Sequence, residues 1–111
     1  MGDHRIDREA WAKLDIFNQM GNIGSEVGRA IKSRRCGKLD RMDNAIDRAL
    51  DLLDATIENL AGQHSPRLKE VLRAREEFLR LFFDDRFDED ADNIERYFMQ
   101  FAIAARNGAV A

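Results

Sequence analysis

A short basic segment about a third of the way along the chain is the part of the sequence best suited to bind phosphate. Lysine and arginine neutralise backbone phosphates, so this segment predicts a local patch for RNA. No aromatic residue is interleaved with the cations, and stacking on bases is therefore not predicted. The same cations also suit a helix C-terminus, where they oppose the partial negative charge of the last carbonyls. The patch consists of Lys32, Arg34, Arg35 and Lys38.

Arg75 is predicted to be a buried charge, because its neighbours at helical spacing are leucine, valine and phenylalanine. Arginine keeps its proton in proteins, so a buried guanidinium needs an acidic partner. We favour Glu26, since Gly24 and Gly28 on either side of it leave room for a long side chain. The same position is also compatible with a polar ligand pocket, or with a side chain that reaches out to water. The candidate acids are Glu26, Asp54 and Glu58.

The sequence contains few residues arranged to bind a metal ion or to act in catalysis. The pattern Asp88-x-Asp90-x-Asp92 resembles the start of a calcium loop, but the required glycine and the final glutamate are absent. Acids at the start of a helix are explained by the helix dipole. Cys36 is the single cysteine and has no histidine near it in the sequence. We therefore expect a protein without catalytic residues, cofactor or metal.

Three glycines interrupt a helical pattern between residues 16 and 31. Glycine inside a helix costs about 1 kcal/mol relative to alanine, so a packing reason is expected. The three residues fall along one edge of an apolar stripe and predict a smooth groove. We expect the aromatic-rich segments near the C-terminus to fill this groove; a second subunit or a ligand is the alternative. The glycines are Gly21, Gly24 and Gly28.

The elements that carry these residues are predicted to be helices. Apolar residues recur every three to four positions in four segments, about 5–35, 39–61, 66–83 and 89–106. Gly37, Gly62 and Gly108 follow helical segments, as C-terminal caps do, and Ser65-Pro66 is typical of a helix start. Short connections favour antiparallel neighbours. We therefore predict one all-α domain over residues 1–111, an up-down-up-down antiparallel four-helix bundle.

The last predicted helix has a second apolar face. Met99 and Ile103 lie opposite its main apolar stripe. A small bundle leaves such a face in water unless something covers it. We expect a subunit contact there, and hence a homo-oligomer; two tolerated surface residues are the alternative.

Composition limits the function classes. The 111 residues are 44% hydrophobic, which excludes a disordered chain, and the net charge of −3 argues against a general nucleic-acid binder. The single cysteine excludes an intrachain disulfide. No membrane-spanning run or signal peptide is recognisable, so we expect a soluble cytoplasmic protein with no membrane partner.

Segment 22–29 carries a family resemblance, in Asn22-Ile23-Gly24 and Gly28-Arg29. It resembles a stretch of small bacterial four-helix-bundle proteins first found encoded in ribosomal intervening sequences, which are akin to retroelement accessory subunits. The resemblance implies an oligomeric bundle without catalytic residues. We expect a non-enzymatic interaction module that self-associates and docks onto a protein or ribonucleoprotein. The alternative is an RNA-binding accessory of a reverse transcriptase, acting through the basic patch.

Overall fold

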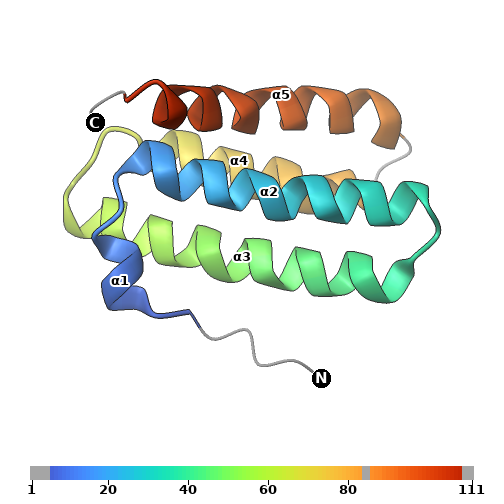
Figure 1. Ribbon diagram of the computed structural model, residues 1–111, viewed down its shortest axis with the longest axis horizontal. Helices are drawn as coiled ribbons and strands as arrows, with labels where there is room; N and C mark the ends of the chain where they lie inside the picture. The colour runs from blue at the N-terminus through green and yellow to red at the C-terminus, as the bar shows by residue number, and fades with distance from the viewer. Residues whose placement is uncertain (1–5, 84–85, 109–111) are drawn as a thin grey trace.

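Five helices form the regular structure of residues 6–83 and 86–108, the part of the chain that the computed structural model describes. The predicted all-α class is confirmed (Figure 1). None of these helices is long and apolar enough to cross a membrane. In chain order the helices are α1 (Arg8–Ala12), α2 (Ile16–Arg35), α3 (Leu39–Gly62), α4 (Leu68–Leu81) and α5 (Phe87–Arg106).

The prediction of a single first helix over residues 5–35 is wrong, because the chain turns between α1 and α2. Residue 5 lies outside the described part. Asp15 has an extended backbone and is the N-cap of α2, because its carboxylate accepts a hydrogen bond from the backbone N–H of Asn18 in the first turn of that helix. The buried side chain of Gln19 donates to the carbonyls of Trp11 and Leu14, both at 3.0 Å. The Gln19 side chain thereby ties the end of α1 to the start of α2, and the carbonyl of Trp11 also accepts from the N–H of Leu14 at 3.1 Å.

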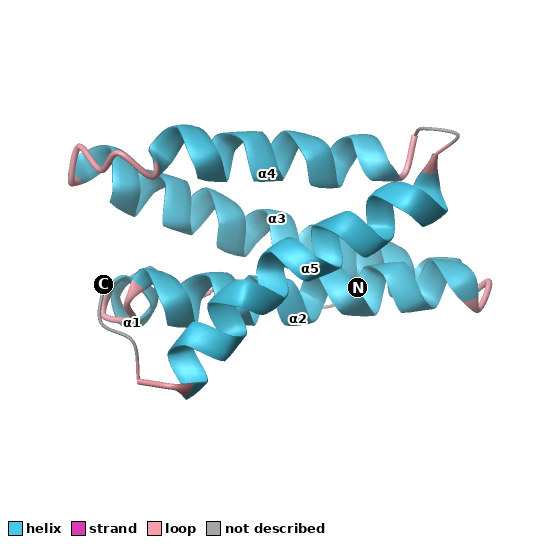
Figure 2. Ribbon diagram, turned by 90° about the horizontal axis from the view of Figure 1, so that it is seen from above, coloured by secondary structure: helices cyan, strands magenta, loops and turns pink. Residues whose placement is uncertain are grey.

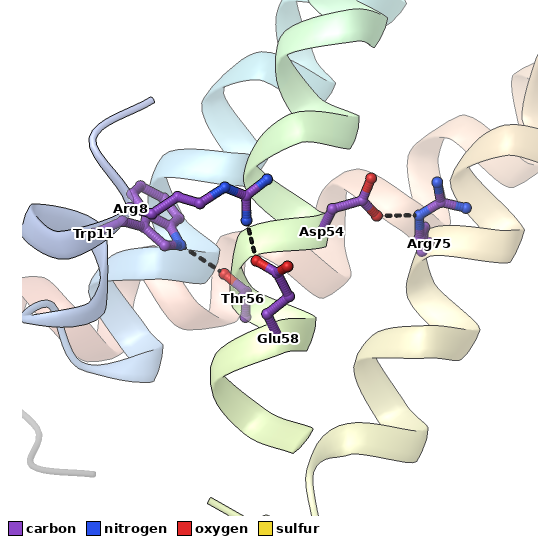
Figure 3. Close-up of polar contacts among 6 residues, drawn as sticks. All are labelled: Arg8, Trp11, Asp54, Thr56, Glu58 and Arg75. Carbon is purple, nitrogen blue, oxygen red and sulfur yellow. Dashed lines mark hydrogen bonds and ion pairs between the residues drawn. The ribbon is translucent and has the colours of Figure 1, made fainter. Parts of the chain in front are cut away.

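The short helix α1 is held against α3 by its tryptophan. The Nε1–H of Trp11 donates to the hydroxyl of Thr56 at 2.9 Å, and Thr56 is completely buried. Arg8 and Glu58 form an ion pair on the exposed side of the same contact (Figure 3). Because α1 has only five residues, its position depends on these side chains and not on intrinsic helix stability.

We predict that Thr56→Val will lower the free energy of unfolding by about 1–2 kcal/mol, because it leaves the buried indole N–H of Trp11 without an acceptor. Trp11 is the only tryptophan in the sequence, so tryptophan fluorescence reports on the surroundings of this side chain. The emission spectrum of the native variant should change, together with an earlier denaturation midpoint. Arg8→Gln, which removes only the exposed ion pair, is the control and should leave both nearly unchanged. Identical spectra for Thr56→Val and the parent would contradict the proposed role of this bond.

Left-handed residues close the C-terminal ends of three helices. Gly37 and Gly108 have φ angles of 70° and 74°, as expected for glycines at helix ends. Gly62 does not play this part, because α3 continues through it and His64 adopts the left-handed conformation, with φ of 51°. Ser65 accepts a hydrogen bond from the N–H of Arg67 at 3.2 Å, but α4 itself begins only at Leu68.

Helix α2 occupies the centre of the packing, with α3 and α5 against it, while α4 packs against α3 and α5. Consecutive helices from α2 to α5 run in alternating directions (Figure 1). Seen from above, α5 crosses α2 obliquely and does not run alongside it (Figure 2). Side chains with no exposed surface include Met20, Ile23, Val27, Ala45, Ala49, Leu53 and Phe78.

Candidate anion-binding cleft

A cavity of about 560 Å³ opens between the last turns of α2 and the first turns of α3. It lies close to the α2–α3 connection, at the opposite end of the molecule from α1 (Figure 1). Its α2 wall comes from residues spaced by three, four and seven, which share one helix face. We call this cavity the basic cleft. Its lining is Arg29, Lys32 and Ser33 from α2, Cys36 at the C-cap of α2, Lys38 at the N-cap of α3, and Arg41, Asn44 and Arg48 from α3.

Two of the cations in the basic cleft are anchored by one buried carboxylate. Glu26 is 8% exposed, and its Oε2 accepts a hydrogen bond from Nε of Arg48 at 2.6 Å. Its other oxygen pairs with Arg29, one helical turn further along α2. Because each oxygen has its own arginine, the buried charge is compensated on both sides. This arrangement holds Arg29 and Arg48 in place on opposite walls.

Three further cations of the cleft have no acidic partner among the residues that the structure describes. Lys32, Lys38 and Arg41 make no ion pair within residues 6–83 and 86–108, and all three are exposed. Five cations therefore face one carboxylate, which leaves an excess of four positive charges in the cleft. The protein as a whole has a net charge of −3. The basic cleft is thus a local concentration of positive charge on a chain that is negative overall, and positive local charge favours the binding of an anion.

The predicted patch is divided by the structure, because Arg34 and Arg35 point away from the cleft. The guanidinium of Arg34 lies 3.8 Å from the centre of the Phe87 ring and donates to the carbonyl of Leu81 at 3.4 Å. Successive helical residues point about 100° apart, so neighbours in sequence face different elements. Arg35 forms ion pairs with three acids of α5: Asp92 at 3.4 Å, Glu95 at 3.7 Å and Asp88 at 3.8 Å.

Sequence reasoning missed Arg29, Arg41 and Arg48, which complete the cleft. The signal was present in α3, where Arg41, Asn44 and Arg48 follow the three- and four-residue spacing of one face. The sequence did not predict that Arg29 lies close to these residues, because that proximity depends on how α2 and α3 are aligned along their lengths.

The glycine groove is filled by α5. A Cβ atom on Gly24 would stand 2.8 Å from Cβ of Phe98, and one on Gly21 would stand 3.3 Å from Cα of Ala102. Both glycines therefore let α5 approach α2 closely, and the Phe98 contact is one that the sequence predicted. Gly28 was wrongly included in the groove, because no atom lies within 4 Å of the place a Cβ would take.

The predicted pair between Arg75 and Glu26 is wrong. Nε of Arg75 lies 2.8 Å from Oδ1 of Asp54, and the arginine side chain is 33% exposed (Figure 3). Helix α4 reaches this carboxylate because it packs against α3, whereas α2 packs mainly against α3 and α5. Glu26 on α2 is occupied by Arg29 and Arg48. Arg75 is therefore half-buried in a pair between α4 and α3.

The apolar side chains of Met99 and Ile103 on α5 are exposed to solvent. Met99 is 53% exposed and Ile103 is 46% exposed. The opposite side of α5 carries Ile94, Phe98 and Phe101, all buried. The helix therefore has two apolar faces, of which this chain covers one.

The groups in the basic cleft suit electrostatic recognition. Guanidinium and ammonium groups donate hydrogen bonds to phosphate or carboxylate oxygens, and arginine does so with two donors at once. Within the described residues, no group of three or more histidine, cysteine or acidic side chains is placed to hold a metal ion. No protein-family model, curated protein or solved structure matches this chain.

Proposed function

We propose that the protein is a non-enzymatic helical interaction module that docks onto a ribonucleoprotein or protein partner through the basic cleft. The observation that supports this proposal is the excess of four positive charges in one cavity of a net negative chain. The cleft favours a partner that presents phosphate, since arginine and lysine on two walls can contact it from both sides. RNA binding is the alternative function, and it is tested first because RNA presents phosphate groups.

Binding of a single-stranded RNA oligonucleotide, measured at two salt concentrations, tests this function. Each phosphate contact contributes about −0.7 to the slope of log affinity against log salt for single strands. Lys32→Gln with Arg41→Gln removes two unpaired cations from the cleft and should reduce both affinity and slope. The control is Lys13→Gln with Arg96→Gln, because both residues are exposed, lie outside the cleft and make no ion pair among the described residues. Equal loss in both double variants would contradict binding at the cleft.

Self-association through α5 is the second part of the proposal, supported by the exposure of Met99 and Ile103. We predict that Met99→Glu with Ile103→Lys lowers the mass measured by light scattering, because both changes place charge in an apolar contact. The pair of changes leaves the net charge unaltered.

The control for this prediction is Leu39→Lys with Leu72→Glu, which alters two exposed leucines of α3 and α4. Its mass should equal that of the parent. A parent protein that is already monomeric, or a mass unaffected by the α5 changes, would contradict self-association at this face.

The finer architecture and cellular setting are also proposals. We propose that α2 to α5 constitute an up-down-up-down antiparallel four-helix bundle, which the alternating helix directions support (Figure 1). The oblique crossing of α5 over α2 is a departure from the regular geometry of such bundles (Figure 2). We propose further that the chain is related to the small bacterial intervening-sequence proteins that segment 22–29 resembles, and that it acts in the cytoplasm.

A further inference from the structure

The positive charge of the basic cleft is confined to a small area. On α3, the exposed acids Asp40, Asp43 and Asp47 follow the adjoining helix face. Arg35, the last residue of α2, adds no free charge to the cleft, because it is paired with acids of α5. A long polyanion that extended along α3 past the cleft would meet the exposed carboxylates of Asp40, Asp43 and Asp47. The distribution of charge therefore favours a compact anion over an extended one.

The volume and the lining of the cleft also favour a compact anion. Its volume of about 560 Å³ lies within the roughly 300–1,000 Å³ typical of small-ligand sites. No aromatic side chain lines it, so it offers no platform on which a nucleobase could stack. Its donors are instead three arginines and two lysines from both walls, together with Ser33 and Asn44. An excess of four positive charges matches several adjoining phosphoryl groups better than a single one.

We propose that the basic cleft binds a chain of two or three linked phosphoryl groups. Lys32, Lys38 and Arg41 would provide the unpaired donors, while Arg29 and Arg48 remain held by Glu26 and contribute their outer N–H groups. This inference rests on the proposed function, since it names the anionic group that the cleft recognises. The same chemistry occurs in a free nucleoside triphosphate and at the 5′-triphosphate end of an RNA.

Calorimetric titration of the full chain with inorganic tripolyphosphate at low salt tests the inference. Tripolyphosphate should bind more tightly than inorganic phosphate. Lys32→Gln with Arg41→Gln should weaken its binding about tenfold or more, because hydrogen bonds to charged groups are lost. Lys13→Gln with Arg96→Gln should bind as the parent does. If the first double variant does not fold, Lys38→Gln takes its place, with a smaller loss expected.

Cys36 supplies an independent readout of where the ligand sits. It is the single cysteine, it is exposed, and it lines the basic cleft. Its rate of alkylation by iodoacetamide, a neutral reagent, should fall when tripolyphosphate occupies the cleft. Binding that leaves this rate unchanged places the ligand elsewhere and overturns the inference.

Two further titrations distinguish the sources of the ligand. An RNA with a 5′-triphosphate should bind more tightly than the same RNA with a 5′-hydroxyl if the ligand is an RNA end. A nucleoside triphosphate that binds while neither RNA does identifies a free nucleotide. If both RNAs bind equally and tripolyphosphate does not, the inference is overturned and the proposed docking on RNA stands. If none of the anions binds, both are overturned.

Discussion

Gly24→Leu is expected to lower the free energy of unfolding by about 2–3 kcal/mol, the cost typical of overpacking a close contact. Even the first atom of the new side chain, Cβ, would lie 2.8 Å from Cβ of Phe98. Cβ of Phe98 joins a buried ring to the backbone of α5. It cannot move without moving the ring or the helix, unlike the end of a flexible side chain. Either α5 shifts away from α2, or the leucine takes a strained conformation. Chemical denaturation followed by circular dichroism measures the loss.

Gly28→Ala is the matched control, one helical turn further along α2. No atom lies within 4 Å of the place its Cβ would take, so the substitution meets no obstacle. Alanine should then raise the free energy of unfolding by about 1 kcal/mol, through its higher helix propensity. Opposite signs at the two glycines are the expected pattern. A leucine at position 24 that unfolds at the parent's denaturant concentration would show that α5 does not pack there.

Arg48→Ala is expected to cost about 2–3 kcal/mol, because it removes one of the two partners of a buried carboxylate. Glu26 is 8% exposed, and the bond from Nε of Arg48 is 2.6 Å long. Arg29 still pairs with the other oxygen, which keeps the loss below that of a completely stranded charge. The denaturation midpoint of the variant measures the effect.

Arg75→Ala provides the comparison for a pair that is only half-buried. Its partner Asp54 and the arginine itself are 46% and 33% exposed in their side chains, so the loss should be about 1 kcal/mol or less. The double variant Arg48→Met with Glu26→Gln should recover part of the Arg48→Ala loss, because it no longer buries a charge. If Arg48→Ala and Arg75→Ala prove equally mild, then Glu26 must be better solvated than its burial indicates.

The secondary structure of this protein was largely readable from the sequence. Helical spacing of apolar residues identified the segments that became α2, α3, α4 and α5, because that spacing places one apolar stripe on each helix. Gly37 marked a helix end correctly, since it is one of the residues that adopts a left-handed φ easily. The break between α1 and α2 was missed. At this break the Gln19 side chain donates to the carbonyls of Trp11 and Leu14, a contact that no periodicity encodes.

Pairings between helices depended on tertiary structure. The sequence identified Arg75 as a charge in need of a partner, but whether Asp54 or Glu26 met it depended on which helix α4 packs against. The composition of the basic patch was likewise visible, yet Arg34 and Arg35 face α5 while Lys32 and Lys38 face the cleft. A one-residue step along a helix turns a side chain by about 100°, so only the packed position of the helix decides what that side chain meets.

The chain by itself therefore determined an all-helical protein with a local excess of cations near residue 35. Only the packed structure assembled the basic cleft, by setting Arg29 of α2 opposite Arg48 of α3 with Glu26 between them. Arg48 lies 22 residues from Glu26 in the sequence, and their closeness in space follows from the alignment of α2 on α3. That alignment results from the simultaneous burial of many apolar side chains along both helices. No short sequence motif predicts it.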